Sequence, residues 1–594
     1  MRKKNKRTNI LVFRDLPLKY APAANIGMLV FALVSGICSV IQVYVVSDFI
    51  DIALQTAQKM KLDIQLFLAL FLLMLTIAVD WLAPRIQNIL RQKSELKLLE
   101  IYRPTLLEKC AKLEFVHVEQ AESHDLISRV LKETEKKWLD IYQAMLALLK
   151  LLISIIGILF VIAGYVWWAA LLILLFCIPL FVLSIKSGKK NYQAKRDTSQ
   201  YSRKYWYLDY VLNSRECLEE RKVFGYSDKI NKKYADTYYE AFWIETKTQI
   251  HWALKTKISG GLSSIAALLI VITLIQPTLA GKISIGLFIS LVNAIFLLTS
   301  QMSWGLSRNI DALVDGNEFC KDMREFWQLS ENEEVLELPH YLENIEQIEF
   351  RNVTFRYPGT DFDVLKNVSF TMNMGKNYAL VGSNGAGKTT VIKLLTGLYT
   401  DYAGEIRING KELQEYTQAE KKGMFSVVYQ DFVQHALTFR ENCEIGDLCN
   451  TIPQERITEL FEQFELMDAV KNFPDGYDTL LGKTREGGVD LSGGQWQKLA
   501  MVRALLRPAK VRILDEPTAS LDPKMESEIY QLFQRLTGEK LTILISHRLG
   551  FAKLADEIIV FDDGTICEQG DFARLMERNG LFCKMYEEQR SWYE

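Results

Sequence analysis

The sequence predicts a multidomain membrane protein, in which a six-helix all-α transmembrane domain precedes an α/β P-loop domain. Apolar runs recur through the first half of the chain and are absent from the second, and a helix of about 20 such residues crosses the hydrocarbon core of a bilayer. The second half instead carries G-S-N-G-A-G-K-T at 382–389, a full match to the phosphate-loop pattern G-x-x-x-x-G-K-[ST]. We therefore expect a transmembrane domain over 1–330, a linker over 331–346 and a nucleotide-binding domain over 347–594.

The overall charge argues against one class of partner. A formal net charge of -2 leaves no excess of positive charge to neutralise phosphates, which argues against a general nucleic-acid binder. The nine cysteines form no C-x-x-C pair, which favours reduced thiols. The start is basic like a signal peptide, but its first apolar segment is longer than a signal sequence needs, so we predict a retained span. Residues 10–20 fit either an amphipathic surface segment or a disordered tail.

Six segments are apolar enough to be transmembrane helices: 23–46, 62–82, 146–163, 167–185, 258–276 and 283–304. Short links alternate with two long loops that are rich in Lys and Arg near the span ends. Because positively charged loops stay in the cytoplasm, we predict that both long loops and the P-loop domain are cytoplasmic. Each long loop is expected to turn at a short polar segment, 119–130 or 215–226. This segment either faces the nucleotide-binding domain or forms a solvated helical hairpin.

Several polar or aromatic residues lie in the predicted spans and are candidates for a cavity or for a contact between helices. They are Gln42, Asp80, Trp81, Asn293, Gln301 and Trp304. Asp80, near the cytoplasmic end of its span, could meet headgroups or pair with Arg85. No strongly cationic or anionic lining emerges from these residues, which favours an amphipathic or apolar ligand.

The phosphate loop has the sequence context that its chemistry requires. A short apolar run at 378–381 predicts a strand before it, and an amphipathic pattern predicts a helix after it. We expect its amides to surround phosphates, Lys388 to reach the β- and γ-oxygens, and the Thr389 hydroxyl to ligate Mg²⁺. The candidate nucleotide-binding residues are Gly382, Ser383, Asn384, Gly385, Ala386, Gly387, Lys388, Thr389 and Thr390.

A second motif supplies carboxylates. Residues 511–516 predict a strand that ends in Asp515 and Glu516. Asp515 is placed to hold Mg²⁺, directly or through water, and Glu516 is placed to orient or deprotonate an attacking water. Arg512 is unexpected inside a buried strand, and the sequence offers no reason for it.

Between these motifs, L-S-G-G-Q at 491–495 resembles the signature of the ATP-binding cassette (ABC) family. The Ser492 hydroxyl and the glycines that open a helix would form an anion site. The resemblance implies that Ser492, Gly493, Gly494 and Gln495 complete the ATP pocket of an opposite subunit. It therefore implies an α/β P-loop ATPase domain, ATP and Mg²⁺ as cofactors, and a second chain, with a homodimer expected.

Further positions match the family one by one. Tyr357 resembles the aromatic residue that stacks on adenine, and Gln430 resembles the glutamine that senses Mg²⁺ and water. Asp522 lies in the loop that the family places at the dimer interface. His547 resembles the switch histidine that contacts the γ-phosphate and steadies Glu516. Glu486 is at the position where exporters of the family have a glutamate that faces the cytoplasmic loops. Trp496 is a departure, because many members have a polar or basic residue there.

Six spans before one cassette look like a half-transporter of the exporter type in a bacterial cytoplasmic membrane. The functional hypothesis is ATP-driven export, by alternating access, of an amphipathic or apolar cargo such as a peptide, a drug-like molecule or a lipid. The expected partners are a second chain, membrane lipid and the transported molecule. The alternatives are a lipid floppase, one subunit of a heterodimer, and a non-transporting membrane ATPase that senses a ligand. About 22 residues precede the first span, too few for a leader-peptide protease domain.

Overall fold

The chain divides into two compact units. The computed structural model describes residues 19–591 except 61, 166, 302–304, 474, 483–487, 517–530, 533–534, 536–537, 539 and 547–548. The helical unit comprises Met1–Glu108 and Asp125–Leu329, and the sheet unit comprises Lys109–His124 and Ser330–Glu594. Residues 109–124, in the first predicted cytoplasmic loop, thus group with the sheet unit. Residues 10–18 of the predicted amphipathic segment lie outside the described part of the chain.

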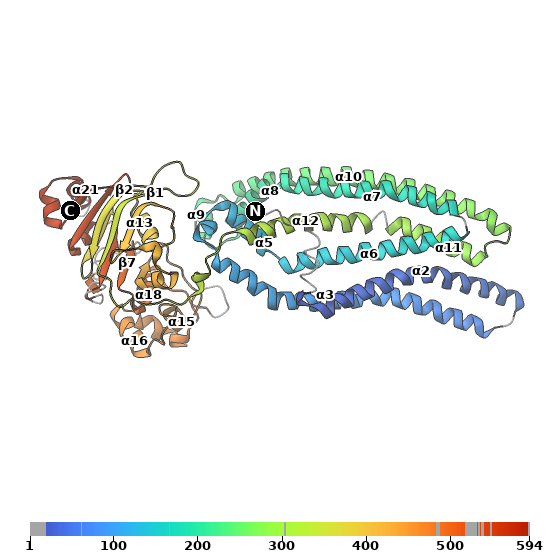
Figure 1. The fold of residues 1–594 in the computed structure, drawn as a ribbon, viewed down its shortest axis with the longest axis horizontal. Helices are drawn as coiled ribbons and strands as arrows, with labels where there is room; N and C mark the ends of the chain where they lie inside the picture. Colours follow the sequence, from blue (N-terminus) through green and yellow to red (C-terminus); the bar gives the residue numbers. More distant parts are fainter. Residues whose placement is uncertain are drawn as a thin grey trace. The chain divides into compact units, whose positions relative to one another are not determined.

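Long helices that run alongside one another build the helical unit (Figure 1). They are α2 (Pro22–Lys59), α3 (Ile64–Lys112), α6 (Thr134–Tyr165), α7 (Trp167–Asp197), α10 (Ser227–Leu279), α11 (Ile285–Ser300) and α12 (Leu306–Gln328), with the shorter α5 (Ala121–Leu131), α8 (Ser199–Asn213) and α9 (Leu218–Phe224). Each predicted span overlaps one long helix. Among the described residues, α2, α3 and α6 are long and apolar enough to cross a membrane, while 267–279 at the end of α10 and the 16-residue α11 are shorter apolar stretches.

Polar contacts between helices fix the register of this unit. The Gly286 amide of α11 donates to Asp51 Oδ1 of α2 (2.8 Å), and a Cβ at Gly286 would lie 2.2 Å from the Ser47 carbonyl oxygen, so the two backbones require glycine there. Of the two alternatives for Asp80, headgroup contact or pairing with Arg85, the structure, which describes both residues, does not show the second. Asp80 instead accepts a hydrogen bond from Lys150 of α6 (3.5 Å), because the two side chains meet across neighbouring helices.

Two sheets form the sheet unit. The antiparallel sheet has the order β2-β1-β4-β5, and the second has the order β10-β9-β3-β8-β7-β6, parallel except for β10. The strands are β1 (Gln347–Phe355), β2 (Leu365–Asn373), β3 (Asn377–Gly382), β4 (Ala403–Ile408), β5 (Lys411–Glu412), β6 (Phe425–Val428), β7 (Val511–Asp515), β8 (Leu541–Ile545), β9 (Glu557–Asp562) and β10 (Thr565–Gly570). The parallel core and the helices around it confirm the predicted α/β domain.

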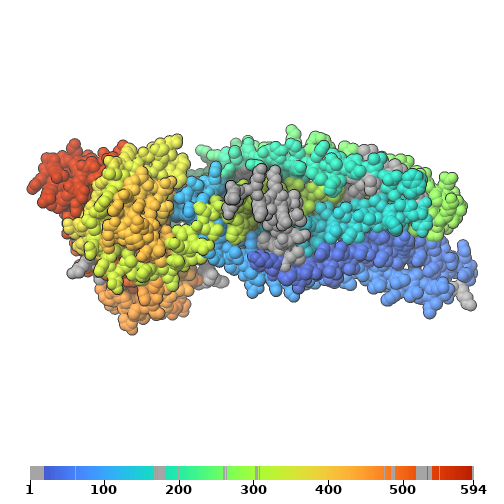
Figure 2. Space-filling model, viewed as in Figure 1, coloured from blue at the N-terminus to red at the C-terminus, as the bar shows by residue number. Residues whose placement is uncertain are grey.

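Helices surround these sheets, and several gather into a lobe beside them, orange in Figure 2. The helices of the sheet unit are α4 (Phe115–Glu119), α13 (Lys388–Leu395), α14 (Gln418–Met424), α15 (Phe439–Glu444), α16 (Gln454–Gln463), α17 (Met467–Asn472), α18 (Gly493–Leu506), α20 (Phe572–Glu577) and α21 (Leu581–Arg590). The lobe contains α15 and α16, and α18 joins it to the parallel sheet through a shared apolar core.

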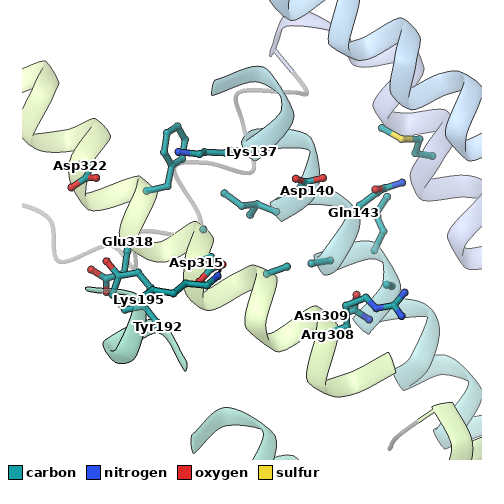
Figure 3. A pocket seen from close by; sticks show the side chains of 18 of the residues that line it. Lys137, Asp140, Gln143, Tyr192, Lys195, Arg308, Asn309, Asp315, Glu318 and Asp322 are labelled. Atoms are coloured by element: carbon teal, nitrogen blue, oxygen red, sulfur yellow. Dashed lines mark hydrogen bonds and ion pairs between the residues drawn. The ribbon is translucent and has the colours of Figure 1, made fainter. Parts of the chain in front are cut away.

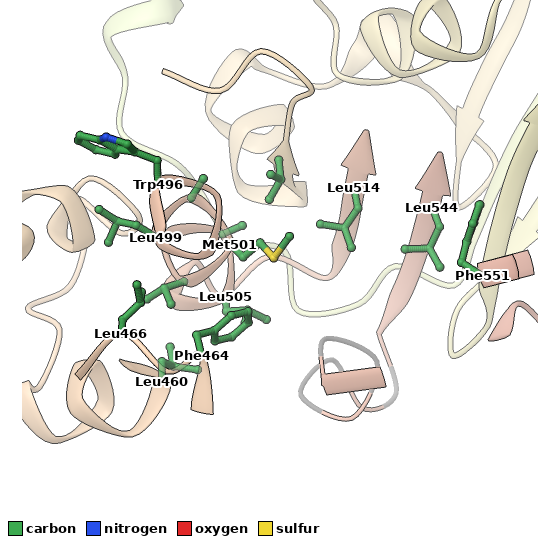
Figure 4. Packing of buried hydrophobic residues seen from close by; sticks show 14 of the residues in the cluster. Leu460, Phe464, Leu466, Trp496, Leu499, Met501, Leu505, Leu514, Leu544 and Phe551 are labelled. Atoms are coloured by element: carbon green, nitrogen blue, oxygen red, sulfur yellow. The ribbon is translucent and has the colours of Figure 1, made fainter. Parts of the chain in front are cut away.

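This core explains the tryptophan that follows the signature motif. Trp496 on α18 is 3% exposed and belongs to the same apolar cluster as Leu466 and Leu499 (Figure 4). Its indole Nε1 donates to Asp490 Oδ1 (3.2 Å), so the one polar atom of the ring is satisfied. Trp496 therefore holds the signature helix against the lobe.

Arg512 is buried within β7, and the structure gives it a partner. Its Nη2 donates to the Leu505 carbonyl oxygen at the end of α18 (3.4 Å). Burial lowers its pKa to about 10, and the nearby cation Arg456 acts in the same direction. Arg512 thus ties the strand that carries Asp515 to the signature helix.

We expect Trp496→Ala to destabilise the sheet unit by about 3–5 kcal/mol, because it removes a buried aromatic side chain and leaves a cavity. Trp496→Phe, which keeps most of the packing, should lose less. Thermal unfolding of the detergent-solubilised chain, followed by intrinsic fluorescence, measures both changes. Trp243→Ala is the control, because Trp243 is 62% exposed. Equal unfolding temperatures for Trp496→Ala and the control would contradict this role.

Candidate functional site

Four parallel strands end at one edge of the larger sheet, and each leads into a residue that the sequence singled out. The phosphate loop follows β3, Gln430 follows β6, Glu516 follows β7, and His547 comes after β8. Since β8 lies between β3 and β7, motifs far apart in the sequence meet at one edge, where α/β sheets bind ligands. Gln430 is exposed in the turn after β6. His547, Asp522 and Glu486 lie outside the described residues.

The phosphate loop depends on glycine at two positions. A Cβ at Gly382 would lie 2.2 Å from the Phe561 carbonyl oxygen of β9. Position 382, where the loop begins at the end of β3, therefore requires glycine. Gly385 has a φ of 81°, in the left-handed region that favours glycine. The following helix, α13, begins at Lys388, so its N-terminal amides face the loop and make it an anion site.

Lys388 lies within its own loop. Its ammonium donates to the carbonyl oxygens of Gly382 and Ser383, both at 2.9 Å, and the residue is 5% exposed. Burial lowers its pKa, and the carboxylates of Glu516 and Asp515 oppose that shift. A buried cation whose hydrogen bonds go to neutral carbonyls gains strongly from an anion that comes into direct contact with it.

Thr389 and Asp515 come together from different motifs. The Thr389 hydroxyl donates to Asp515 Oδ1 (3.4 Å), and Asp515 is 1% exposed. Burial raises the pKa of Asp515 to about 6, although the Thr389 hydrogen bond acts against the shift. A buried carboxylate beside a hydroxyl is a pair of oxygen ligands of the kind that Mg²⁺ takes, with phosphates and water completing its shell.

Glu516 has an unusual backbone conformation. Its φ is 48°, a value that non-glycine residues rarely adopt, and its amide donates to the Ile545 carbonyl oxygen of β8 (2.9 Å). That bond to the neighbouring strand holds the strained residue in place. Burial raises the pKa of Glu516, with Lys388 opposing the shift, and a raised pKa suits a carboxylate that accepts a proton.

Tyr357 is anchored next to the phosphate helix. Its hydroxyl hydrogen-bonds with the Thr390 Oγ1 of α13 (3.0 Å), and its ring meets the Tyr399 ring edge-on at 5.4 Å. Tyr357, Tyr399 and Phe115 border a cavity of about 980 Å³ within the sheet unit. Two candidate nucleotide-binding residues, Tyr357 and Thr390, are thus joined directly.

The sequence did not point to Lys393, which lies in a cage of aromatic rings. Its ammonium lies 5.2 Å from the Tyr357 ring, 5.8 Å from Phe115 and 5.9 Å from Tyr399. It also pairs with Glu119 Oε1 (3.0 Å). Phe115 and Glu119 belong to α4, so the contact between this loop and the sheet begins upstream of the predicted turn at 119–130. The other predicted turn, 215–226, forms α9 in the helical unit, with no buried residue.

We expect Lys393→Met to raise the KM for ATP about two- to fivefold with little change in kcat. Cation–π contacts of this kind contribute about 0.5–1 kcal/mol each at exposed sites, and their loss frees the ring predicted to stack on adenine. Lys411→Met is a matched control. Lys411 lies 4.2 Å from the Tyr416 ring, so it makes the same kind of cation–π contact, but it belongs to β5 of the antiparallel sheet and not to the phosphate helix. An unchanged KM in Lys393→Met would show that the cage does not position Tyr357.

The signature residues cap their own helix. The Ser492 hydroxyl accepts from the Gln495 amide (3.3 Å), and the Gln495 side-chain oxygen accepts from the Ser492 amide (2.9 Å). Gly493 and Gly494 form the first turn of α18. Within the described residues, no hydrogen bond or ion pair joins 492–495 to the phosphate loop. The hydrogen bonds of Ser492 and Gln495 thus serve to cap α18.

Comparisons with known proteins agree with this site. A family model described as ABC transporter matches residues 365–519, which contain the phosphate loop, the signature and both carboxylates. The ATP-dependent lipid A-core flippase of Photorhabdus laumondii is 30% identical over 478 residues, which cover 79% of this chain and 79% of the flippase. The chain belongs to the ABC transporter family.

Other ABC proteins match nearly the full length. The subtilin transport ATP-binding protein SpaT of Bacillus subtilis is 29% identical, covering 94% of this chain and 90% of SpaT. The nisin transport ATP-binding protein NisT of Lactococcus lactis is 28% identical, covering 85% and 84%. A solved bacterial Atm1-family ABC exporter with ATP bound shares the fold, with a TM-score of 0.73 and 22% identity over 96% of this chain and 98% of the other. This chain is a multi-pass membrane ABC exporter that binds and hydrolyses ATP, which confirms the resemblance seen in its motifs.

Proposed function

We propose that this ABC exporter moves a peptide across the cytoplasmic membrane. The observation that carries this choice is the match to the subtilin transport protein, which extends over 94% of the chain. The match to the P. laumondii flippase has a similar identity, 30% against 29%, but it extends over only 79% of the chain. Export of a lipid is the second candidate, because that flippase reaches 30% identity.

The site residues divide the work of hydrolysis. The amides of the phosphate loop and Lys388 bind the β- and γ-phosphates, and Tyr357 stacks on adenine. Thr389 and Asp515 would hold Mg²⁺ together with Gln430, and the ion would neutralise charge on the phosphates. Glu516 orients the attacking water and accepts its proton, and His547 steadies Glu516 beside the γ-phosphate.

A second copy of the chain completes each ATP site. The signature motif at 491–495 and the match to the ABC transporter family support this assignment. Ser492, Gly493, Gly494 and Gln495 of one protomer would face the γ-phosphate that its partner holds, and Asp522 would lie at that interface. Binding of two ATP molecules would bring the cassettes together and open the transport path outward, and hydrolysis would reset it.

The test is the ATPase activity of the purified chain in lipid vesicles, measured with added peptides and, separately, with added lipids. Stimulation of at least about twofold by amphipathic peptides, and not by lipids, is the expected result. Stimulation by lipids alone would favour the second candidate. No activity in a preparation that binds ATP would contradict the homodimer and indicate that a different chain supplies the second signature.

A further inference from the structure

The helical unit contains a cavity of about 830 Å³ between α6, α7 and α12, lined also by α2 and α3. Small or apolar residues, among them Ile141, Ala144 and Ala312, also line it. Charged residues lie along its length, with Lys137 on α6 and Arg308 on α12 well apart in Figure 3. None of the polar residues predicted within the spans lines this cavity.

Every acidic residue that lines the cavity already has a cationic partner. Asp140 pairs with Arg91 (2.6 Å), Asp315 with Lys195 (2.9 Å), Asp322 with Arg129 (3.0 Å) and Glu318 with Lys321. The lining cation Lys150 likewise pairs with Asp80. The negative charge of the lining is therefore neutralised within the protein.

Three lining cations remain, and within the described residues none of them has a carboxylate at ion-pair distance: Lys132, Lys137 and Arg308. Lys137 donates to the Arg129 carbonyl oxygen (3.4 Å) and lies 4.8 Å from the Phe319 ring centroid. Burial lowers the pKa of Lys137, the more distant carboxylates of Asp322 and Glu133 oppose the shift, and Lys132 and Arg129 add to it. Arg308 is exposed. The cavity thus carries uncompensated positive charge.

We propose that this cavity binds an acidic segment of the peptide cargo, with carboxylates at Lys137 and at Arg308 and an apolar stretch between them. The inference rests on the proposed export of a peptide. The Lys137 ammonium lies over the Phe319 ring, so the position of Phe319 on α12 marks the position of Lys137. Arg308 and Phe319 are about 16 Å apart along α12, at 1.5 Å per residue. An extended peptide crosses that distance in about five residues. The favoured ligand therefore carries acidic side chains about five positions apart.

The position of Lys137 favours a peptide over a lipid headgroup. Lys137 precedes the predicted start of its span by nine residues, 146 minus 137, which is about 13 Å of helix outside the hydrocarbon. A headgroup bound there would draw its acyl chains out of the membrane, at about 0.8 kcal/mol for each CH₂ exposed. A peptide that enters from the cytoplasm has no such penalty.

The test measures binding of a fluorescent peptide to the full chain in nanodiscs of neutral phosphatidylcholine, without nucleotide. One probe is an apolar 12-residue peptide with Asp at two positions five apart, and the other has Asn at both. We expect the Asp peptide to bind at least about tenfold more tightly, a difference of about 1.4 kcal/mol, because a carboxylate can pair with each cation and the Asn amide cannot. The preference should weaken with salt.

Lys137→Gln with Arg308→Gln should abolish this preference and leave binding of the Asn peptide unchanged. Lys189→Gln with Lys229→Gln, which removes two exposed cations outside the cavity, should keep it. Equal binding of both peptides to the unaltered chain, or a preference that survives the first double variant, would overturn the proposal. So would a dependence on Lys137 and Arg308 that appears only with anionic phosphatidylglycerol nanodiscs, which would assign the cavity to lipid headgroups.

Peptide-stimulated ATP hydrolysis separates this inference from the proposed function. Charge-selective binding without stimulation by either peptide would support the acidic subsite and count against peptide export. Stimulation by both peptides alike, together with equal binding, would support export and reject the subsite. Unchanged unstimulated ATPase activity of the double variant confirms its fold, because neither residue belongs to the nucleotide site.

Discussion

Glu516→Gln is expected to lower ATP turnover by about 10²–10⁴-fold, the usual contribution of a general base, while ATP binding stays close to normal. The amide is nearly the same size as the carboxylate, so the backbone with its φ of 48° and the bond to Ile545 are kept. Only the group that accepts a proton from water is lost. Phosphate release and equilibrium binding of labelled ATP, measured on the same preparation, give the two numbers.

The control for this change is Glu455→Gln, which alters an exposed glutamate on α16, away from the sheet edge. It should leave both numbers unchanged. Turnover in Glu516→Gln within a factor of two of the unaltered chain would remove Glu516 from the mechanism. A matching loss of ATP binding would instead show that the substitution had damaged the site.

Lys388→Ala is expected to weaken ATP binding by at least about 100-fold, because it removes two or more charge-assisted hydrogen bonds worth about 1.5–3 kcal/mol each. Lys388 is 5% exposed and its ammonium donates to two loop carbonyls, so it is already positioned before a phosphate arrives. The expected pattern is opposite to that of Glu516→Gln, which binds ATP and does not hydrolyse it.

Equilibrium binding of labelled ATP tests Lys388→Ala, with Lys376→Ala as the control. Lys376 is an exposed lysine just before β3, so its loss changes the charge without touching the phosphate loop. Retained affinity in Lys388→Ala would mean that the backbone amides and the helix end bind the phosphates without the lysine. The roles assigned to the loop would then need revision.

The fold of the sheet unit was predictable because its motifs occupy strand ends. A phosphate loop after β3 and two carboxylates after β7 require parallel strands that end at one edge, and the hydrogen bond between Thr389 and Asp515 shows that they meet. The helical nature of the first unit was predictable, since apolar runs of about 20 residues form helices that cross lipid. In both cases the signal is local in the sequence.

Pairings across the chain were not predictable in this way. The cage around Lys393 brings together α4, α13 and the Tyr357 loop, and no local pattern marks a lysine as the partner of Glu119. The surplus charge near Lys137 and Arg308 emerges only after each acid is matched to its cation across helices. Trp496 appeared to be a departure because many family members have a polar or basic residue there, and its role became clear only from its packing with Leu466 and its bond to Asp490.

The most direct test of peptide export is uptake of a fluorescent peptide into sealed inside-out vesicles that contain the purified chain. We predict ATP-dependent accumulation in the unaltered chain and none in Glu516→Gln, with the peptide retained inside after washing. Hydrolysis of ATP at a normal rate with no accumulation of any amphipathic peptide, while labelled lipid moves between leaflets, would contradict peptide export.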